Sequence, residues 1–388
     1  MSRFRLYPTP EQEQALLGHC AHARFVWNLG LEQRLEWRPE RGPTPGFAGQ
    51  CRQLTAARAE FEWLRDGAQM VQQQALRDLD QAWRNFFAGT HRKPTWRKQG
   101  KHEGFRVVGD ESCRHKTVNR RWSQVHIPKV GWVRLRRSRA VPDARSYRVT
   151  RDRTGRWHVA FAATPEPLPG PGTGEVVGID RGVAITLALS NGIIFQAPGP
   201  RGVGRLHRKF SRAKRGSKRR GRLGVRLARL HARNADARKD WAEKASTQIA
   251  RNYDLIRIED LPLRNMTRSA KGTPQNPGRN VRQKAGLNRA ILASGWGLFA
   301  QRLEDKASGR VEKINPAFTS QTCSQCKIID REARESQAVF RCRTCGHCEN
   351  ADVNAAKNIA AGHAVTARGG SALAGPVNRE LQLSLLAS

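Results

Sequence analysis

Three acidic residues in this sequence have the type and placement that metal-dependent chemistry requires. Asp180 and Glu259 each end a short apolar run, at 176–179 and 255–258, and Asp352 lies at the start of a helix-like stretch. Carboxylate oxygens are hard ligands that suit Mg²⁺ or Mn²⁺, and two such ions can clamp the attacking and leaving oxygens of a phosphodiester. If the fold gathers the three carboxylates, they indicate a nuclease.

Each of these acids also has an ordinary structural explanation. An Asp at the end of a strand often caps a turn, and an Asp in the first turn of a helix interacts favourably with the helix dipole. The three acids together, with the sheet order and the charge of the chain, favour metal ligation. Asp260 is an alternative to Glu259, because strand alternation alone does not say which side chain faces the metals.

Half of the eight cysteines lie in two CxxC pairs with 15 residues between the pairs: Cys323, Cys326, Cys342 and Cys345. This spacing fits tetrahedral thiolate coordination of Zn²⁺ on two tight knuckles, and so predicts a structural zinc ribbon. A catalytic zinc is disfavoured, because four thiolates leave no open position for water. His347 and Cys348 lie close enough in sequence to compete for the fourth ligand position.

The charge balance predicts a polyanionic partner. Lys and Arg number 70 against 33 Asp and Glu, which gives a net charge of +37. Nucleic acid is favoured over a membrane surface, because no apolar run approaches the roughly 20 residues of a spanning helix and no lipidation signal is present. The first residues lack the apolar core of a secretory signal, so we expect a cytoplasmic protein. A reducing compartment favours metal over disulfides at the CxxC pairs.

One segment carries this charge in its most concentrated form. Residues 201–233 contain 14 Lys or Arg and no Asp or Glu. An unbalanced run of this length repels itself unless phosphates neutralise it, which favours a nucleic-acid contact over a solvated face. The candidate contact residues are Lys214, Arg215, Lys218, Arg219 and Arg220.

Periodicity divides the first half of the chain into a helical part and a strand-rich part. A short strand is expected at 3–9, and helical spacing follows at 11–37, 51–63 and 68–87. Short alternating runs between 104 and 163 predict a small antiparallel β unit, which we expect to close into a barrel. The stretch rich in Pro and Gly from residue 165 predicts a linker.

The second half has the order of elements expected of an RNase H-like sheet. Strands are expected at 176–180, 184–189 and 193–196, and the pair Asn191-Gly192 predicts a hairpin between the last two. A long basic helical region at 206–252, a strand at 255–258, a helix at 287–306 and a strand at 311–314 follow. In such a sheet, carboxylates gather at one end of the central strands.

Four motifs closely resemble the TnpB family, the insertion-sequence proteins often called transposases and related to type V CRISPR effectors. They are Gly178-Ile179-Asp180-Arg181-Gly182, Ile258-Glu259-Asp260-Leu261, Asn315-Pro316-Ala317-Phe318-Thr319-Ser320-Gln321-Thr322-Cys323 and Ala351-Asp352-Val353-Asn354-Ala355-Ala356. The likeness covers almost the whole chain and includes Phe4-Arg5-Leu6-Tyr7-Pro8-Thr9 and Ala82-Trp83-Arg84-Asn85-Phe86-Phe87. The chain departs from the family at Lys327, where Gly is common, and in its short approach to Asp352.

The resemblance implies a multidomain chain of the α+β and α/β classes. It implies a wedge β-barrel interrupted by recognition helices, then a RuvC-type nuclease domain with a zinc-ribbon insert. The predicted boundaries are, in chain order, 1–164 for the barrel, about 11–90 for the helices inside it, 165–174 for a linker, 175–316 and 349–362 for the nuclease domain, 317–348 for the ribbon and 363–388 for a disordered tail.

The resemblance also implies RNA-guided cleavage of double-stranded DNA beside a short transposon-associated motif, with Mg²⁺ or Mn²⁺ as the cofactor. The family's catalytic acids fall on Asp180, Glu259 and Asp352, which selects Glu259 over Asp260. One rival is a DNA strand transferase, although the His-hydrophobic-His motif of its tyrosine-dependent form is absent. Another is an RNA-guided repressor that no longer cuts, which should have lost one of the three acids.

Overall fold

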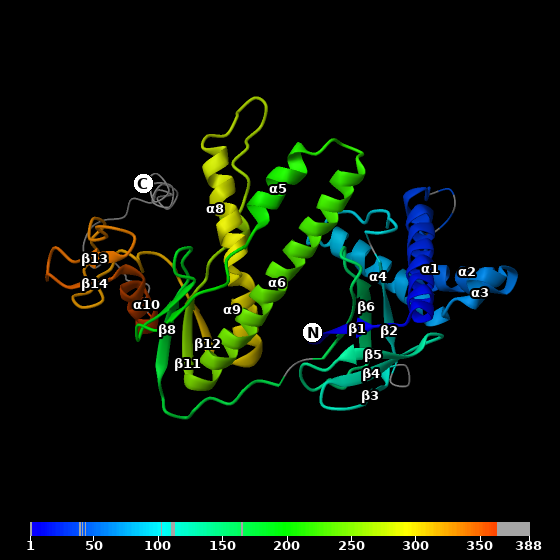
Figure 1. Cartoon of the computed structure of the whole chain (residues 1–388), viewed down its shortest axis with the longest axis horizontal. Helices are drawn as coiled ribbons and strands as arrows, with labels where there is room; N and C mark the ends of the chain where they lie inside the picture. The colour runs from blue at the N-terminus through cyan, green and yellow to red at the C-terminus, as the bar shows by residue number, and fades with distance from the viewer. Residues whose placement is uncertain are drawn as a thin grey trace. The chain divides into compact units, whose positions relative to one another are not determined.

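The computed structural model describes residues 2–38, 40, 42, 44–101, 103–109, 113–163 and 166–362. The chain divides into two compact units, Met1–Thr164 and Pro165–Ser388 (Figure 1). The predicted disordered tail at 363–388 lies outside the described residues. No helix of the described part is both long and apolar enough to cross a membrane.

The first unit contains an antiparallel sheet in which the first strand joins two groups of strands. Its order is β2-β6-β7-β1-β5-β4-β3. The strands are β1 (Ser2–Tyr7), β2 (Gly104–Val108), β3 (His115–Thr117), β4 (Trp122–Ile127), β5 (Gly131–Arg136), β6 (Ser146–Arg151) and β7 (Trp157–Phe161). β1 pairs with β7 through its first residues and with β5 through Leu6 and Tyr7. Because β2 and β3 end this order, closure into a barrel stays a prediction.

Four helices are inserted between β1 and β2, where the periodicity predicted three helical segments. They are α1 (Pro10–Leu35), α2 (Phe47–Glu60), α3 (Glu62–Asp66) and α4 (Gln69–Phe87). α1 begins at a capping box, in which the Thr9 side chain accepts from the Gln12 N–H and the Gln12 side chain accepts from the Thr9 N–H. The short α3 was not predicted, because five residues are too few to show a helical period.

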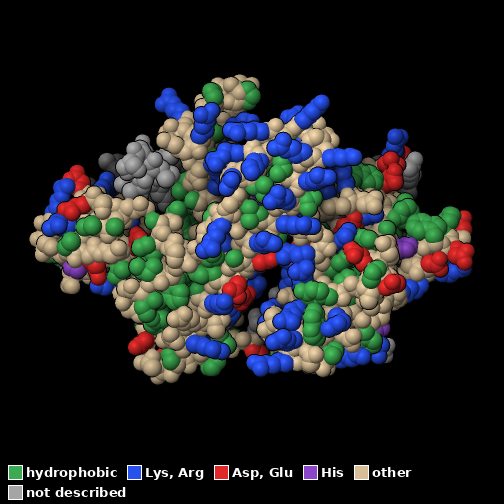
Figure 2. Space-filling view, viewed as in Figure 1, with side chains coloured by type: hydrophobic (Ala, Val, Ile, Leu, Met, Phe, Trp, Pro, Cys, Tyr) green, Lys and Arg blue, Asp and Glu red, His purple; other side chains and the backbone are tan. Residues whose placement is uncertain are grey.

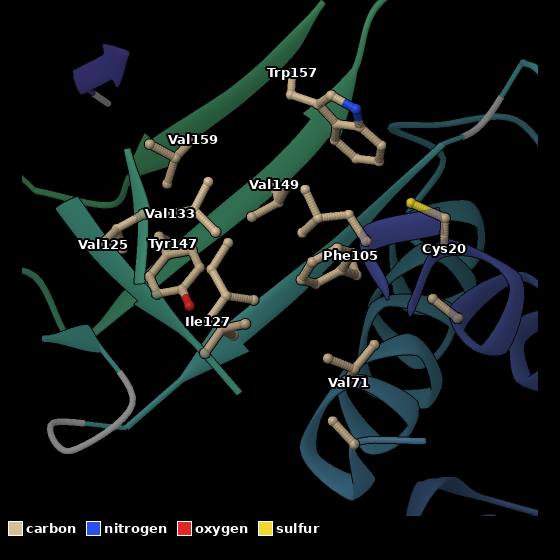
Figure 3. Close-up of a cluster of buried hydrophobic side chains, with 14 of the residues drawn as sticks. Cys20, Val71, Phe105, Val125, Ile127, Val133, Tyr147, Val149, Trp157 and Val159 are labelled. Atoms are coloured by element: carbon tan, nitrogen blue, oxygen red, sulfur yellow. The ribbon is translucent and has the colours of Figure 1, made fainter. Parts of the chain in front are cut away.

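The core of the first unit lies between the sheet and these helices. Phe105, Tyr147 and Val149 from the strands meet Cys20 from α1 and Val71 from α4, and all five are buried (Figure 3). The alternation of buried and half-buried residues along β4 places the apolar side chains on this one face. Period-two patterning therefore predicted the strand-rich character of 104–163 correctly, whereas the three-residue β3 was not predicted.

The second unit contains a mixed five-stranded sheet in the order β10-β9-β8-β11-β12. Its strands are β8 (Val176–Asp180), β9 (Leu187–Leu189), β10 (Ile194–Phe195), β11 (Leu255–Glu259) and β12 (Val311–Ile314). β8, β11 and β12 run parallel. β9 pairs antiparallel with β8, and β10 pairs antiparallel with β9. The predicted hairpin is confirmed: Gly192 has φ +86°, and its N–H donates to the Leu189 carbonyl.

Two predicted helical segments are each broken by a residue with left-handed backbone. The region 206–252 forms α5 (Val203–Arg212) and α6 (Lys218–Asn252), and Gly216 between them has φ +80°. The segment predicted as one helix at 287–306 forms α8 (Val281–Ser294) and α9 (Trp296–Lys306), separated by Gly295 at φ +79°. A positive φ cannot continue a right-handed helix, so the single-helix prediction was wrong.

The remaining elements lie beside the sheet of the second unit. A short helix α7 (Leu263–Met266) follows β11, and a hairpin of β13 (Val339–Arg341) and β14 (Cys348–Asn350) precedes the last helix, α10 (Ala351–Ala361). α10 packs directly on β8 at Gly178, where a Cβ atom would lie 2.1 Å from the Ala356 carbonyl oxygen. Only glycine permits this approach, which lets the middle of α10 pack closely on β8.

Candidate active site

Two neighbouring parallel strands and one helix carry the three predicted acids. Asp180 and Glu259 are the last residues of β8 and β11, and the register pairs Ile179 with Ile258. Both carboxylates therefore lie at the same edge of the sheet. Asp352 lies in the first turn of α10, which packs on β8. The fold thus brings residues that are far apart in the sequence to one edge.

The three carboxylates share one electrostatic environment. Glu259 and Asp352 are buried and Asp180 is half-buried. Burial, followed by the negative charges of Glu259 and Asp352, raises the pKa of Asp180 well above its ordinary value. Burial also raises the pKa of Glu259 and that of Asp352. Oxygen donors that repel one another in this way fit a site for divalent cations.

The spacing of the three carboxylates is wider than that of a single-ion cage. Within the described ranges, four cysteines form the one group of three or more Cys, His, Asp or Glu whose ligand atoms all lie within 4.8 Å of one another. The three acids do not form such a group. The acids are therefore close enough to interact electrostatically but do not converge on a single point.

Glu259 is held at both its side chain and its backbone. Thr319 Oγ1 lies 2.7 Å from Glu259 Oε1, and Arg181 Nη2 donates to the Glu259 carbonyl oxygen. Asp260, by contrast, is exposed. Glu259 is therefore the buried acid that interacts with Asp180, which strand alternation alone could not decide.

Asp352 has a basic partner that no sequence pattern indicated. Arg334 Nη2 donates to Asp352 Oδ1 at 3.1 Å and also to the Gln337 carbonyl oxygen at 3.0 Å. Asn350 caps α10 by accepting the N–H of Asp352 at 3.0 Å. Arg334 belongs to no pattern that the sequence analysis identified, and Thr319 lies in the motif at 315–323, which gave no sign of its contact with Glu259. Arg181, next to Asp180, was visible in the sequence but gave no sign of its role.

The four predicted cysteines do converge. The Sγ atoms of Cys323 and Cys345 are 3.6 Å apart, and so are those of Cys326 and Cys342. Four sulfurs at about 2.3 Å from one zinc ion lie about 3.8 Å apart, so these thiols fit a tetrahedral Zn²⁺ site. Hydrogen bonding to the Cys345 N–H lowers the pKa of Cys342 to about 7, whereas burial raises the pKa of Cys323, so the four thiols differ in how readily they form the thiolate before a metal binds.

The two other ligand candidates lie outside this cluster. His347 Nε2 lies 3.3 Å from Ser324 Oγ and 3.4 Å from Glu349 Oε2, and Cys348 is exposed on β14. Cys345 is the fourth thiol of the group. The geometry favours the two CxxC pairs over a site that includes His347 or Cys348.

Helix α10 connects the cysteine cluster to the acidic residues. Asn354 Nδ2 donates to the Thr322 carbonyl at 2.8 Å, and Asn354 Oδ1 accepts the Ser324 N–H at 2.8 Å. One turn later, Asn358 Nδ2 donates to the carbonyls of Thr319 and Thr322. The first cysteine knuckle is thus bonded to the helix that carries Asp352, and Thr319 in the same segment contacts Glu259.

The predicted nucleic-acid contact residues lie at the junction of α5 and α6, where Lys and Arg side chains cover the surface (Figure 2). Lys214, Arg215, Lys218 and Arg219 are exposed. Arg220 differs, because its guanidinium lies 4.2 Å from the Phe210 ring centroid and donates to the carbonyls of Phe210 and Ala213. Four of the five residues are therefore available to a partner, whereas Arg220 holds the junction together.

Family models match three parts of the chain. A model described as "Probable transposase" for the OrfB proteins of IS605 matches residues 158–270. A helix-turn-helix domain model of the same family matches residues 2–43, and a Cas12f1-like TNB domain model matches residues 296–359. The last match includes the cysteine cluster and Asp352.

Relatives of known name match nearly the full length. The chain is 34% identical over 379 residues to a protein of Escherichia coli K12 named "Putative RNA-guided DNA endonuclease InsQ", covering 95% of this chain and 93% of the relative. It is 30% identical to a protein of Streptomyces pristinaespiralis with the same description, covering 95% and 90%. A cryo-EM structure of Cas12f1 with sgRNA and target DNA has a similar fold, with a TM-score of 0.51 at 13% identity and coverage of 90% and 82%.

Proposed function

The chain belongs to the TnpB family, and we propose that it is an RNA-guided DNA endonuclease encoded by an insertion sequence. The relatives that match over nine-tenths of both chains are named for this activity. The net charge of +37 suits a protein that holds a structured RNA and a DNA duplex together.

The observation that carries this proposal is the meeting of Asp180, Glu259 and Asp352 at one edge of the sheet. These carboxylates would hold Mg²⁺ or Mn²⁺, which when bound supplies a Lewis acid and an activated water for phosphodiester hydrolysis. A two-ion arrangement is the one that such carboxylates provide in nucleases that clamp the attacking and leaving oxygens. All three acids are present, which favours cleavage over a repressor that binds without cutting.

The order of the elements supports a finer assignment of the architecture. The strand order of the second unit, with parallel β8 and β11 ending in acids, supports an RNase H-like domain of the RuvC type. The cysteine cluster, inserted between β12 and α10, would be a structural zinc ribbon at 317–348. The sheet and helices of the first unit would form the wedge and the recognition helices.

The partners would be a transposon-derived guide RNA and a double-stranded DNA target beside a short motif. The exposed basic residues between α5 and α6 offer phosphate contacts to either one.

Substitution of the acids tests the catalytic assignment. Asp180→Ala, Glu259→Ala and Asp352→Ala should each abolish DNA cleavage and leave RNA and DNA binding nearly unchanged, because the carboxylates position metals and do not contact phosphates directly. Asp260→Ala is the matched control, since this neighbouring acid is exposed, and it should cut like the wild type. If any of the three active-site variants cuts DNA at nearly the wild-type rate, the acid that it replaces does not belong to the site.

A further inference from the structure

Arg181 is an unusual arginine for this chain, because it is buried. Its side chain is 6% exposed, and it directly follows Asp180 at the point where β8 ends. Burial of a guanidinium is costly unless its hydrogen bonds and charge are satisfied. The surroundings of Arg181 must therefore offset that cost.

The hydrogen bond of Arg181 goes to the neighbouring strand. Its Nη2 donates to the carbonyl oxygen of Glu259, which also accepts the Leu261 N–H at 3.1 Å. β8 ends at Asp180, so the ladder between β8 and β11 stops here. The Arg181 side chain reaches β11 just beyond the last residue of β8 and holds the backbone of Glu259. The Glu259 carboxylate accepts a hydrogen bond from Thr319.

The charge of Arg181 is not used in a contact ion pair. No carboxylate oxygen of the described residues lies within 4.0 Å of its nitrogens, and Arg181 Nε has no hydrogen-bond partner there. The acids that interact with it at longer range are Glu259, Asp180, Asp260 and Glu304. An arginine that served only to fill space would be better replaced by an apolar side chain, so its place among these acids indicates a role in the site.

We propose that Arg181 is a positioning residue that fixes the spacing of the Asp180 and Glu259 carboxylates for divalent-metal binding. It acts through its hydrogen bond to the Glu259 backbone and as a buried cation that directly follows Asp180. This inference rests on the proposed nuclease function. Partners that orient metal ligands typically change metal affinity by about 10- to 100-fold when they are removed.

The test compares Arg181→Met and Arg181→Lys with wild type in the full-length protein bound to its guide RNA. The first readout is the Mg²⁺ concentration that gives half-maximal DNA cleavage. The second is independent of activity: Fe²⁺ replaces Mg²⁺, and added hydrogen peroxide oxidises it to Fe³⁺, releasing hydroxide and a hydroxyl radical that cuts the polypeptide near 180 and 259. Ascorbate reduces the Fe³⁺ back to Fe²⁺. Arg310→Met is the matched control, because Arg310 also bonds backbone carbonyls of this unit, those of Tyr253, Leu168 and Ala250.

Arg181→Met should raise the half-maximal Mg²⁺ concentration by about tenfold or more and weaken Fe²⁺-directed polypeptide cutting at limiting Fe²⁺. Excess Mg²⁺ should restore much of the rate, and Arg181→Lys should lie between Arg181→Met and wild type. Arg310→Met should lower the melting temperature without changing metal dependence.

Wild-type metal dependence in both Arg181 variants would overturn the inference. If Arg181→Met does not fold, Arg181→Lys decides, because it keeps the charge and loses the guanidinium geometry. A wild-type complex that cuts no guided DNA would refute the proposed function instead, and the Fe²⁺ readout would still decide the role of Arg181.

Discussion

Asp180, Glu259 and Asp352 repel one another when no cation lies between them. Burial and the two neighbouring carboxylates raise the pKa of Asp180, so the folded protein retains a proton that the unfolded chain releases. Stability from this raised pKa is present at low pH and is lost as the pH rises toward the raised value. A metal-dependent site therefore has a stability cost that a bound cation removes.

Asp180→Asn should relieve this repulsion. The metal-free variant should melt roughly 2–5 °C above metal-free wild type at pH 8, and the difference should shrink toward about pH 5, where the wild-type carboxyl is protonated. Mg²⁺ should raise the melting temperature of wild type more than that of the variant. Thermal unfolding followed by circular dichroism with and without Mg²⁺ measures both effects. A variant that is less stable than wild type at pH 8 would show that repulsion among the carboxylates does not control the stability of the site.

Hydrogen bonds join helix α10, the first cysteine knuckle and Glu259. Asn354 and Asn358 bond the carbonyls of Thr322 and Thr319, and Thr319 contacts Glu259. Loss of the knuckle should therefore loosen both α10 and the Glu259 contact. The cysteines affect cleavage through this packing, since a site closed by four thiolates has no open position for chemistry.

The protein should contain about one zinc per chain, and Cys342→Ser should lose it. That variant should show faster hydrogen exchange over 351–361 and reduced cleavage while it keeps RNA binding. Cys348→Ser is the control, because Cys348 is exposed and outside the cluster, and it should retain zinc and activity. Elemental analysis and hydrogen exchange provide the measurements. An active preparation without zinc would contradict this role.

The sequence predicted the elements that carry the acids better than the contacts between them. β8, β11 and α10 were found because apolar runs and helical spacing are local signals. The helix breaks at Gly216 and Gly295 were missed, since an isolated glycine does not reveal its φ. The short β13 and β14 were missed because three residues show no period. Arg334 and Thr319 reach the acids only through tertiary packing, so no spacing rule could identify them.

Part of the net positive charge of the chain lies on exposed side chains between α5 and α6. Lys214, Arg215, Lys218 and Arg219 are exposed, and none has a carboxylate within 4.0 Å in the part of the chain that the structure describes. Exposed arginines of the β13–β14 segment are paired instead: Arg341 bonds Glu335 at 2.9 Å, and Arg343 bonds Glu332. Unpaired cations release counterions on binding nucleic acid, and paired ones do so much less.

Replacement of Lys214, Arg215, Lys218 and Arg219 by Gln should weaken RNA or heteroduplex binding. The slope of log K against log salt concentration should fall by about 3, at about 0.7–0.9 per lost phosphate contact. Gln at Arg341 and Arg343 is the control and should change the slope little. Fluorescence anisotropy over a salt series measures the slope. Equal slopes for the fourfold variant and wild type would place the nucleic acid elsewhere on the protein.

Guide exchange is the most direct test of the central claim that an RNA directs a three-carboxylate nuclease. The protein is purified with its RNA, the segment of that RNA that pairs with the target is replaced, and cuts are mapped on a plasmid library. The cuts should move to sequences complementary to the new guide, should require Mg²⁺, and should disappear in Asp180→Ala and in RNA-free protein. Cuts that stay at the original sequence, or DNA ends that are joined without RNA, would contradict the account and favour a DNA strand transferase.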